Sequence, residues 1–588
     1  MADRGRDGSW RRVVRRAASL TILGLVGAPG PEASADVAAP VLKWERGGCT
    51  SWCQTGWYAS PAVADIDDDG EPEVVWGSYD LVSLDGATGG LEWRATHANR
   101  VYPGLVIADL TGDGPLEIVV GRNSDNLMVY DSTGAVVWTR HPFGSGEVRT
   151  LAVADLEADG VLEIVAGHAA GVSTNQVEVY EPSGTVRSGW PAKRAGEPGY
   201  GAGLFNQNVA VEDLDGDGDM ELIVPTDSHY IMAFDDGGDQ LPVHAMYTGR
   251  TFWSEVGVHV DHEVDLRGYA HCGTEHRPNF IQGAPAVADV DGDGSLEIVV
   301  VGNVHNCATS PYTSLYQIPF ILRPDRTRWS GAGFDWTVVP TPPAGAGPKS
   351  EDWHVIQSAA TNVVPADLDG DGRLEILYPS YDGRMHAYWL DKTQHGAWPY
   401  TVPATGSGGD TYRFASEPAV VDLDADGSAE VLFASWPRNG SGLSGHLHVL
   451  DAWGNELHRI PLPAVGSGEW NGSLAAPTVA DIDGDPDLEA VLGTAASGVV
   501  AFDLPGTAGA RILWGTGRGS QHRRGVALPG AGPLPALGVS DAQVTEGDAG
   551  TTQVDFTVTL SSPSDDPVSV DFTTGDGTAT AGAAVAPQ

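Results

Sequence analysis

The sequence predicts an all-β protein, and within that class a β-propeller of eight blades followed by a partial β-sandwich. Three observations lead to this prediction. A nine-residue acidic motif recurs eight times along the 588 residues. Short runs rich in β-branched residues flank every copy, as expected of strands. Glycine (77) and proline (39) are abundant, and no long helical periodicity interrupts the pattern.

The motif reads Asp-x-Asp-x-Asp-Gly-x-x-Glu, with variations. Three carboxylates on alternate residues repel one another when bare, and a hard cation with many oxygen ligands, above all Ca²⁺, removes that repulsion. Glycine at position 6 permits a sharp turn with positive φ. The sequence therefore predicts several structural Ca²⁺ ions, one for each well-equipped copy.

The predicted ligands stand at positions 1, 3, 5 and 9 of each copy. Five copies are complete: Asp65, Asp67, Asp69 and Glu73 in copy one; Asp213, Asp215, Asp217 and Glu221 in copy four; Asp289, Asp291, Asp293 and Glu297 in copy five; Asp367, Asp369, Asp371 and Glu375 in copy six; Asp422, Asp424, Asp426 and Glu430 in copy seven. The other three are Asp109, Asp113 and Glu117 in copy two; Asp155, Glu157, Asp159 and Glu163 in copy three; Asp481, Asp483, Asp485 and Glu489 in copy eight.

Those last three copies depart from the motif. Copy two has Thr111 at position 3, copy three has the longer Glu157 there, and copy eight has Pro486 in place of the glycine. Fewer charges and poorer geometry both lower calcium affinity, so we predict weaker sites in these copies. The alternative for any copy is an Asx-type turn without metal, since Asp and Gly also form turns well.

Each motif lies between two short apolar strands, and both faces of these strands are expected to be buried. A third strand usually follows, and then a fourth that often carries Trp, as in residues 91–93, 136–138 and 512–514. Four antiparallel strands form one propeller blade. The motifs are 44 to 78 residues apart, and the longest spacings imply inserts over residues 236–284 and 303–360.

The number of blades depends on how the ring closes. Residues 41–44 have the character of an outer strand and could complete the last blade. That blade, however, also has a candidate fourth strand of its own at residues 512–514. Eight blades is the main prediction, and seven blades with one motif outside the ring is the alternative.

The unit of strand, acidic loop, Glu-led strand and Gly resembles the FG-GAP/VCBS family of repeats, which is found in integrin α-subunit propellers and in secreted bacterial proteins. The resemblance covers roughly residues 41–525, and residues 514–525 resemble the terminal blade of such propellers. It implies a propeller domain over residues 41–530 with metal in its loops, although position 9 of the family motif is usually Asp and Glu is a variant.

After a linker at residues 531–537, the sequence changes to alternating polar and apolar residues, typical of half-exposed sandwich strands. Residues 538–588 resemble the first half of a Calx-β domain. The chain stops about halfway through such a fold, which suggests a fragment. We expect this segment to be poorly ordered, because the missing strands leave sheet edges open.

The first 35 residues have the features of a cleaved signal peptide. Arg11, Arg12, Arg15 and Arg16 precede an apolar run over residues 17–28, and residues 33–35 form a small-x-small cleavage site, so the mature chain would begin near Asp36. The arginine pairs also fit twin-arginine export, but Arg15 interrupts the stretch expected after the first pair, which favours general secretion. The apolar run is too short to span a membrane, and the predicted location is secreted or on the cell surface.

Outside the cytoplasm, four cysteines suggest two disulfides. The simplest pairing joins Cys49 to Cys53 and Cys272 to Cys307, but the sequence does not fix it. The net charge of −46 at pH 7 argues against nucleic acid as a partner, because binding phosphate needs a basic stripe. The sequence gives no indication of the oligomeric state.

Function is expected in the two inserts, which break the repeat. They hold histidines near Cys272 and Cys307 that suggest a disulfide-stapled loop or, as the lesser alternative, a Zn²⁺ site: His259, His262, His271, His276 and His305. The sequence lacks the Gly-x-Ser-x-Gly, His-Glu-x-x-His and P-loop motifs. The leading interpretation is a secreted calcium-binding propeller that serves as a binding or adhesion module for protein or glycan. The competing one is a calcium-dependent polysaccharide lyase or hydrolase with its site in the inserts.

Overall fold

A computed structural model describes most of the chain in two units, which are treated separately: Ala35–Gly532, and Met1–Ser34 together with Pro533–Gln588. The described residues are 37–47, 58–169, 176–190, 204, 209–267, 277–280, 283–305, 316–348, 361–403, 413–437, 442–464, 470–527, 537–539 and 558–560. The predicted signal peptide, all four cysteines and most of the predicted Calx-β-like segment lie outside these residues.

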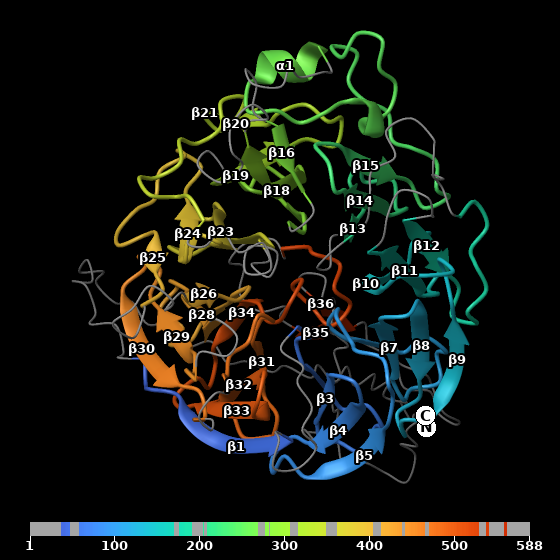
Figure 1. Ribbon diagram of the computed structural model, residues 1–588, viewed down its shortest axis with the longest axis vertical. Coiled ribbons are helices and arrows are strands. Elements are labelled where there is room, and N and C mark those ends of the chain that lie inside the picture. Colours follow the sequence, from blue (N-terminus) through green and yellow to red (C-terminus); the bar gives the residue numbers. More distant parts are fainter. Residues whose placement is uncertain are drawn as a thin grey trace, which may run out of the picture. The chain divides into compact units, whose positions relative to one another are not determined.

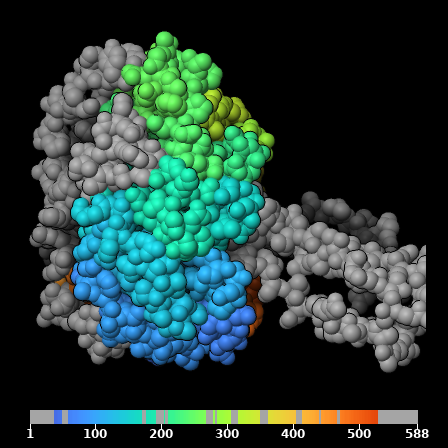
Figure 2. All heavy atoms as spheres, turned by 90° about the vertical axis from the view of Figure 1, so that its right-hand side faces the viewer, coloured from blue at the N-terminus to red at the C-terminus, as the bar shows by residue number. Residues whose placement is uncertain are grey.

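Eight small antiparallel sheets follow one another in chain order around a common axis within the larger unit (Figure 1). Each sheet contains one copy of the acidic motif, which joins its first strand to its second. The prediction of an all-β propeller with eight blades is confirmed, and no motif lies outside the ring. Seen from the side, the outer edges of the first blades follow one another from blue to green (Figure 2).

Five blades have four strands. Their bounds, from the inner to the outer strand, are β2 (Ala62–Ala64), β3 (Glu73–Gly77), β4 (Leu81–Asp85) and β5 (Leu91–Ala95) in blade one; β6 (Val106–Ala108), β7 (Glu117–Arg122), β8 (Asn126–Tyr130) and β9 (Val136–Arg140) in blade two; β22 (Val364–Ala366), β23 (Glu375–Ser380), β24 (Arg384–Tyr388) and β25 (Tyr400–Thr401) in blade six; β27 (Ala419–Asp422), β28 (Glu430–Pro437), β29 (His446–Leu450) and β30 (Glu456–Pro461) in blade seven; β31 (Thr478–Ala480), β32 (Leu488–Gly493), β33 (Gly498–Leu504) and β1 (Val41–Gly47) in blade eight.

The four-stranded pattern is less regular in the described residues of blades three to five. Blades three and four show three strands each: β10 (Val148–Ala154), β11 (Glu163–His168) and β12 (Val177–Tyr180); β13 (Ala210–Glu212), β14 (Glu221–Pro225) and β15 (Ile231–Phe234). Blade five has β17 (Ala286–Ala288), β18 (Glu297–His305) and β19 (Tyr316–Leu322), and its fourth strand, β16 (Arg277–Asn279), pairs with the far end of β18 instead of forming the outer edge. On their outer edges only isolated bridges remain, such as Tyr180 to Val186 and Phe234 to Gln240. Gly189, with φ of +94°, and Pro242, which has no N–H, interrupt a regular ladder there.

The described parts of the inserts add short elements around blades four and five. They are a 3₁₀ helix η2 (Trp253–Glu255), helix α1 (His262–Arg267), strand β16 (Arg277–Asn279), which pairs with the far end of β18, and the hairpin β20 (Ser330–Gly331) to β21 (Phe334–Asp335). Strand β26 (Arg413–Ala415) likewise extends blade seven by pairing with β28. In the second unit, β35 (Leu537–Val539) pairs with β36 (Val558–Leu560). None of the described helices is long and apolar enough to cross a membrane.

The ring closes through its first strand. Strand β1, from the beginning of the chain, pairs antiparallel with β33 and becomes the outer strand of blade eight. The candidate fourth strand at residues 512–514 has a different place, because β34 (Arg511–Trp514) pairs with β27, the innermost strand of blade seven. That assignment from the sequence was therefore wrong. The sequence pattern of an outer strand and of an extra inner strand is the same, and only the pairing tells them apart.

The hydrophobic core lies between neighbouring blades. Alternate residues of a strand point to opposite faces of its sheet. In β3, for example, Val75 packs among residues of blades one and two, while Val74 and Trp76 pack among residues of blades eight and one. Every residue of β3 is buried, as the apolar strand pattern predicts.

Tryptophans of the outer segments connect six of the eight blades to the next one. The indole N–H donates to a backbone carbonyl in the turn after the third strand of the following blade, at 2.8 to 3.1 Å. The pairs are Trp44 to Gly86, Trp138 to Pro182, Trp190 to Asp236, Trp253 to Pro324, Trp336 to Leu390 and Trp398 to Ala452. The recurring Trp is thus a bond between blades as well as an apolar contact.

Residues 515–527 form a central segment that passes through the middle of the ring (orange-red in Figure 1). Its backbone bonds to innermost strands of several blades, with partners at Val153, Val211, Val287 and Val479. The Arg523 guanidinium is 1% exposed and donates to the carbonyls of Leu105 (2.5 Å), Gly517 (3.0 Å) and Ser60 (3.4 Å). The fully buried Arg518 binds the carbonyls of Val209 and Pro285 in the same way. The prediction that residues 514–525 build a terminal blade is therefore corrected: they tie blades together from the inside.

Replacing Arg523 by Met should lower the free energy of unfolding by about 3 kcal/mol or more, because three buried carbonyls lose a charged donor. Urea unfolding followed by tryptophan fluorescence measures this loss. The matched control is Arg250→Met at an exposed position, which should stay within about 0.5 kcal/mol of the wild type. Equal unfolding midpoints for the two variants would contradict the central role of Arg523.

Candidate metal centres in the acidic loops

The eight acidic loops share one buried hydrogen bond. In every copy a side-chain oxygen of the glutamate at position 9 accepts the backbone N–H of position 2, at 2.7 to 3.2 Å. These glutamates start the second strand of each blade and are at most 7% exposed. The bond draws each glutamate back beneath its own loop, so that its second oxygen can face the other carboxylates.

The aspartate at position 1 shapes the turn. In loops one to seven its Oδ2 accepts the backbone N–H of the glycine at position 6, at 2.7 to 3.2 Å. The seven glycines have φ between +83° and +106°, which side chains with a Cβ rarely adopt. Loop eight cannot form this bond because Pro486 has no N–H, and Asp481 accepts from Gly484 at 2.8 Å instead.

Carboxylates converge in the five loops that have a complete motif. Within each of the following groups, one oxygen per residue lies within 4.8 Å of the others: Asp65, Asp67 and Glu73; Asp213, Asp215 and Glu221; Asp289, Asp291 and Glu297; Asp367, Asp369 and Asp371; Asp422, Asp424 and Glu430. Positions 1, 3 and 9 thus meet in four loops, and positions 1, 3 and 5 meet in loop six.

Position 5 has a second task that the motif does not reveal. The side chain of Asp69 accepts the N–H of Glu71 at 2.9 Å, and Asp217, Asp293 and Asp426 accept the N–H two residues ahead in the same way. This is an Asx-type turn. Position 5 therefore fixes the turn in these loops, and its second oxygen stays available as a ligand.

The position-9 glutamates resist ionisation in the absence of a cation. Burial raises their pKa values above the usual range, and neighbouring carboxylates add to the shift, while the hydrogen bond from position 2 opposes it. The pKa is raised to about 7 for Glu73, Glu163 and Glu221, to about 8 for Glu297 and Glu430, and to about 9 for Glu375. Clustered carboxylates of this kind need positive charge nearby.

Two oxygens in these clusters show that the donors suit a metal. Asp291 Oδ1 and Asp369 Oδ1 are buried and have no hydrogen-bond partner. An unpaired buried carboxylate oxygen is costly, and a metal ligand role accounts for it. An all-oxygen set of carboxylates on a flexible loop matches the preference of Ca²⁺. The residues present therefore fit the predicted ion.

The loops also contact one another along one face of the ring. The N–H at position 8 donates to the carbonyl at position 2 of the preceding loop, at 2.8 to 3.0 Å. The four bonds run from Leu116 to Ile66, Met220 to Leu156, Leu374 to Val290 and Ala429 to Leu368. Because strands alternate in direction within a blade, the turn between strands three and four lies on this motif face too, and all other connections lie on the opposite face.

Comparison with known proteins identifies the repeat. Residues 367–433, which run from the sixth acidic loop through the seventh, match the family described as FG-GAP-like repeat. The chain contains an FG-GAP-like repeat. No curated protein matches the chain. The family match does not extend to residues 538–588, for which the Calx-β resemblance stays a prediction.

Several solved structures are similar to this chain over most of its length. The rhamnogalacturonan lyase of Bacillus licheniformis has 16% identity and a TM-score of 0.41, over 79% of this chain and 75% of that one. The V. cholerae biofilm matrix protein Bap1 has 14% identity and a TM-score of 0.35, over 80% of this chain and 92% of that one. Likeness at this level concerns the fold, and it carries no conclusion about activity.

In the three departing repeats, side chains of the protein contact the loop carboxylates. In loop two, Thr111 donates to Glu117 at 3.2 Å. In loops three and eight a side-chain cation reaches the carboxylates: Arg187 contacts Glu157, and Lys43 contacts Glu489. The motif gave no sign of these two cations, because each lies outside the loop it serves. In the sequence, each of these two cations lies close to a Trp of an outer segment, Lys43 before Trp44 and Arg187 before Trp190, and this was the signal that could have revealed them.

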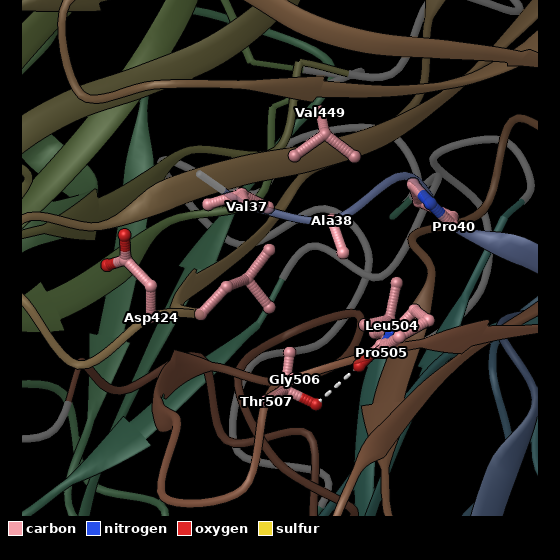
Figure 3. Close-up of a pocket in the computed structure, with 10 residues that line it drawn as sticks. Val37, Ala38, Pro40, Asp424, Val449, Leu504, Pro505, Gly506 and Thr507 are labelled. Atoms are coloured by element: carbon pink, nitrogen blue, oxygen red, sulfur yellow. Dashed lines mark hydrogen bonds between the residues drawn. The ribbon is translucent and has the colours of Figure 1, made fainter. Parts of the chain in front are cut away.

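A small cavity lies on the motif face between blades seven and eight (Figure 3). Its volume is about 210 Å³, and it is lined by mostly apolar residues from the segment before β1, from blade seven and from the turn after β33. Asp424 of loop seven lies at its edge. Ligand pockets usually enclose ~300 Å³ or more, so this cavity is small for a sugar chain.

The described part of the inserts contains a buried ionic network. Asp265 of α1 is fully buried and accepts from Arg328 Nε at 2.9 Å and from the backbone N–H of His259 at 2.7 Å. Burial alone would raise the pKa of Asp265, but the Arg328 charge and the hydrogen bonds outweigh it and hold that pKa below its usual range. His262 Nδ1 lies 3.8 Å from the same carboxylate. The predicted Zn²⁺ alternative also needs His271, Cys272, His276 and Cys307, which lie outside the described residues.

Replacing Gly372 by Ala should cost about 1 to 2 kcal/mol of stability, since its φ is +83°. No atom lies within 4 Å of the added Cβ, so the cost would come from the backbone alone. Gly347→Ala is the matched control, because that position is equally open and its φ lies outside the left-handed region. Urea midpoints in excess chelator compare the two. A Gly372→Ala variant as stable as Gly347→Ala would show that the turn at position 6 tolerates a side chain.

Proposed function

We propose that this protein is a calcium-stabilised β-propeller that works outside the cytoplasm as a binding module, with a glycan as its ligand. The observation that carries the calcium part is the set of five convergent carboxylate groups, two of which contain buried oxygens without a partner. Modules of the cell exterior bind Ca²⁺ with dissociation constants of roughly 0.1 to 1 mM. An exported protein would therefore hold the ions that its loops require.

Calcium is proposed to act on stability. The loops connect the two innermost strands of their blades and are bonded to one another across blades, so an ion in one loop stiffens both. A ligand that binds only the folded state adds about 2.7 kcal/mol at a hundred times its dissociation constant. Five such ions would make a large contribution to a ring of this size.

Removal of calcium should lower the melting temperature by several degrees, because each occupied loop contributes to the folded state alone. Differential scanning calorimetry in EGTA and in about 10 mM CaCl₂, at least ten times the expected dissociation constant, measures the difference. MgCl₂ is the control and should restore less, since Mg²⁺ demands a tighter octahedral shell. An unchanged melting temperature in EGTA, together with no heat of binding on calcium titration, would refute the proposal.

The opposite face of the ring supports a binding role. Connections of blades one to three place three tyrosines around two arginines there. The Arg100 guanidinium carbon lies 5.1 Å from the ring centre of Tyr79 and 5.9 Å from those of Tyr58 and Tyr102, and Arg149 lies 4.1 Å from Tyr102. All five side chains are half-buried. This tyrosine–arginine cluster offers rings that stack on sugars and guanidinium groups that pair with carboxylates.

Arg100 is the member best placed to receive an acidic group. Arg149 already pairs with Glu147 at 2.6 Å. Arg100 donates to the Tyr79 hydroxyl at 2.8 Å, and its Nε is buried without a hydrogen-bond partner. Among the described residues no carboxylate lies within ion-pair distance of Arg100. In a chain of net charge −46, such a cation is a distinctive local feature, and it favours an acidic glycan as ligand.

The described insert residues support binding over catalysis. The fully buried Asp265 is held by Arg328 and His259, which fixes α1 in place. This network has a structural role in the insert. The calcium-dependent lyase or hydrolase is therefore the second candidate, and release of unsaturated or reducing ends from a bound glycan would reveal it.

Tyr102→Ala and Arg100→Met should each weaken binding to an acidic polysaccharide such as polygalacturonate by about tenfold, equivalent to ~1.4 kcal/mol. Affinity electrophoresis or calorimetry in excess Ca²⁺ measures the change. Trp453→Ala is the control, because this residue is 42% exposed on the motif face. If the three variants are retained equally, the cluster is not part of the binding site. If the wild type is not retained at all, acidic polysaccharides of this class are not its ligand.

A further inference from the structure

Lys43 enters the eighth acidic loop from the other end of the chain. It lies on β1 at an irregularity of the pairing with β33, where the register shifts between Leu42 and Trp44. A bulge of this kind re-aims a side chain. The Lys43 ammonium lies 2.6 Å from Glu489 Oε1 and also contacts Asp483. It thereby meets the carboxylates of positions 3 and 9, which also converge in four of the five complete loops.

Arg187 does the same in the third loop. Its Nη1 lies 2.6 Å from Glu157 Oε2 and 3.8 Å from Glu163 Oε1, again positions 3 and 9. Its Nη2 also pairs with Asp236 of the next blade at 2.9 Å. The guanidinium side chain is 10% exposed. The longer Glu157, which looked like a defect of the motif, has the reach that this contact needs.

The equivalent place in blade one holds the opposite charge. Lys43 and Glu92 both directly precede the outer-strand tryptophan, Trp44 in blade eight and Trp93 in blade one. Glu92 is itself an acid that accepts from Ser83 at 2.8 Å. In the described residues, loops one, four and five contain no side-chain ion pair. Loop six has Arg373 on Asp371 at 3.4 Å, at an exposed position, and loop seven has Arg511 3.9 Å from Asp422.

We propose that loops three and eight hold no metal, because Arg187 and Lys43 permanently occupy the place that Ca²⁺ takes in the complete loops. The inference rests on the proposed calcium binding and divides the loops into metal-dependent and metal-independent ones. A calcium ion entering loop eight would have to displace an ammonium group that already neutralises two carboxylates, and the displaced charge would lie unpaired.

Lys43 also contributes to the closure of the ring. Strand β1 closes the ring, and Lys43 bonds that strand to loop eight. The seam between the first and last strands is therefore held by an ion pair within the chain. Loss of calcium would weaken blades one and four to seven and leave the seam closed.

The experiment compares calcium stoichiometry in the full chain by equilibrium dialysis. Asp481→Asn in loop eight and Asp155→Asn in loop three should leave the number of bound Ca²⁺ unchanged. Asp367→Asn and Asp289→Asn, at the same motif position in loops six and five, should each lower it by one. Loss of one ion in Asp481→Asn or Asp155→Asn overturns the inference. If the wild type binds no calcium, the proposed function is overturned, and so is the inference that Lys43 and Arg187 take the place of Ca²⁺.

A second measurement follows the ion pairs without metal. In EGTA, Lys43→Met and Arg187→Met should lower the melting temperature by several degrees more than the exposed control Arg250→Met. Lys43→Arg keeps the charge and should restore most of the loss. Equal melting temperatures for Lys43→Met and Arg250→Met in EGTA would overturn the inference even if the stoichiometry agreed.

Discussion

The glutamate that closes each acidic loop is the constraint on which the rest of the ring depends. It stands where the loop becomes a strand, it is buried, and it accepts the backbone N–H of position 2 in all eight blades. This one bond fixes the loop over the start of the strand and brings a carboxylate into a place where water cannot stabilise its charge. The ionised form of this acid needs a partner, which the chain supplies as Thr111 in loop two, Arg187 in loop three and Lys43 in loop eight. In the complete loops the proposed ion has that part, so fold and proposed metal binding depend on the same buried acid.

A ring of repeats has a second requirement, because each blade is bonded mainly to its two neighbours and the ends must be joined. Three sets of contacts join the blades and the ends of the ring. Strand β1 completes the last blade, the tryptophans of the outer segments bind the next blade's turns, and the central segment reaches carbonyls of the inner strands with Arg518 and Arg523. Buried guanidinium groups suit this task, since each has several donors in a rigid plane and can serve two or three blades at once.

Much of this could be predicted from the sequence, since the information is local. Each loop carries its own ligands and turn glycine within nine residues, and the flanking strands show their burial by composition. What could not be predicted was non-local. Lys43 meets Glu489 across the whole ring, and β34 has the pattern of an outer strand although it pairs inside blade seven. In the described residues of blades three and four the outer edge has no regular fourth strand, and Gly189 and Pro242, which interrupt a ladder, are a local signal of this.

The alternation of strand direction gives the ring two different faces. Carboxylates, turn bonds and loop-to-loop contacts occupy the motif face, where a longer connection would disturb the bonds between positions 2 and 8 of neighbouring loops. The long insert of blade four and the tyrosine–arginine cluster both arise from connections on the opposite face. Changes in those connections would leave the buried glutamates and their loops in place. Connecting segments tolerate change better than the elements they join, so the proposed binding face can vary while the motif face keeps the ring together.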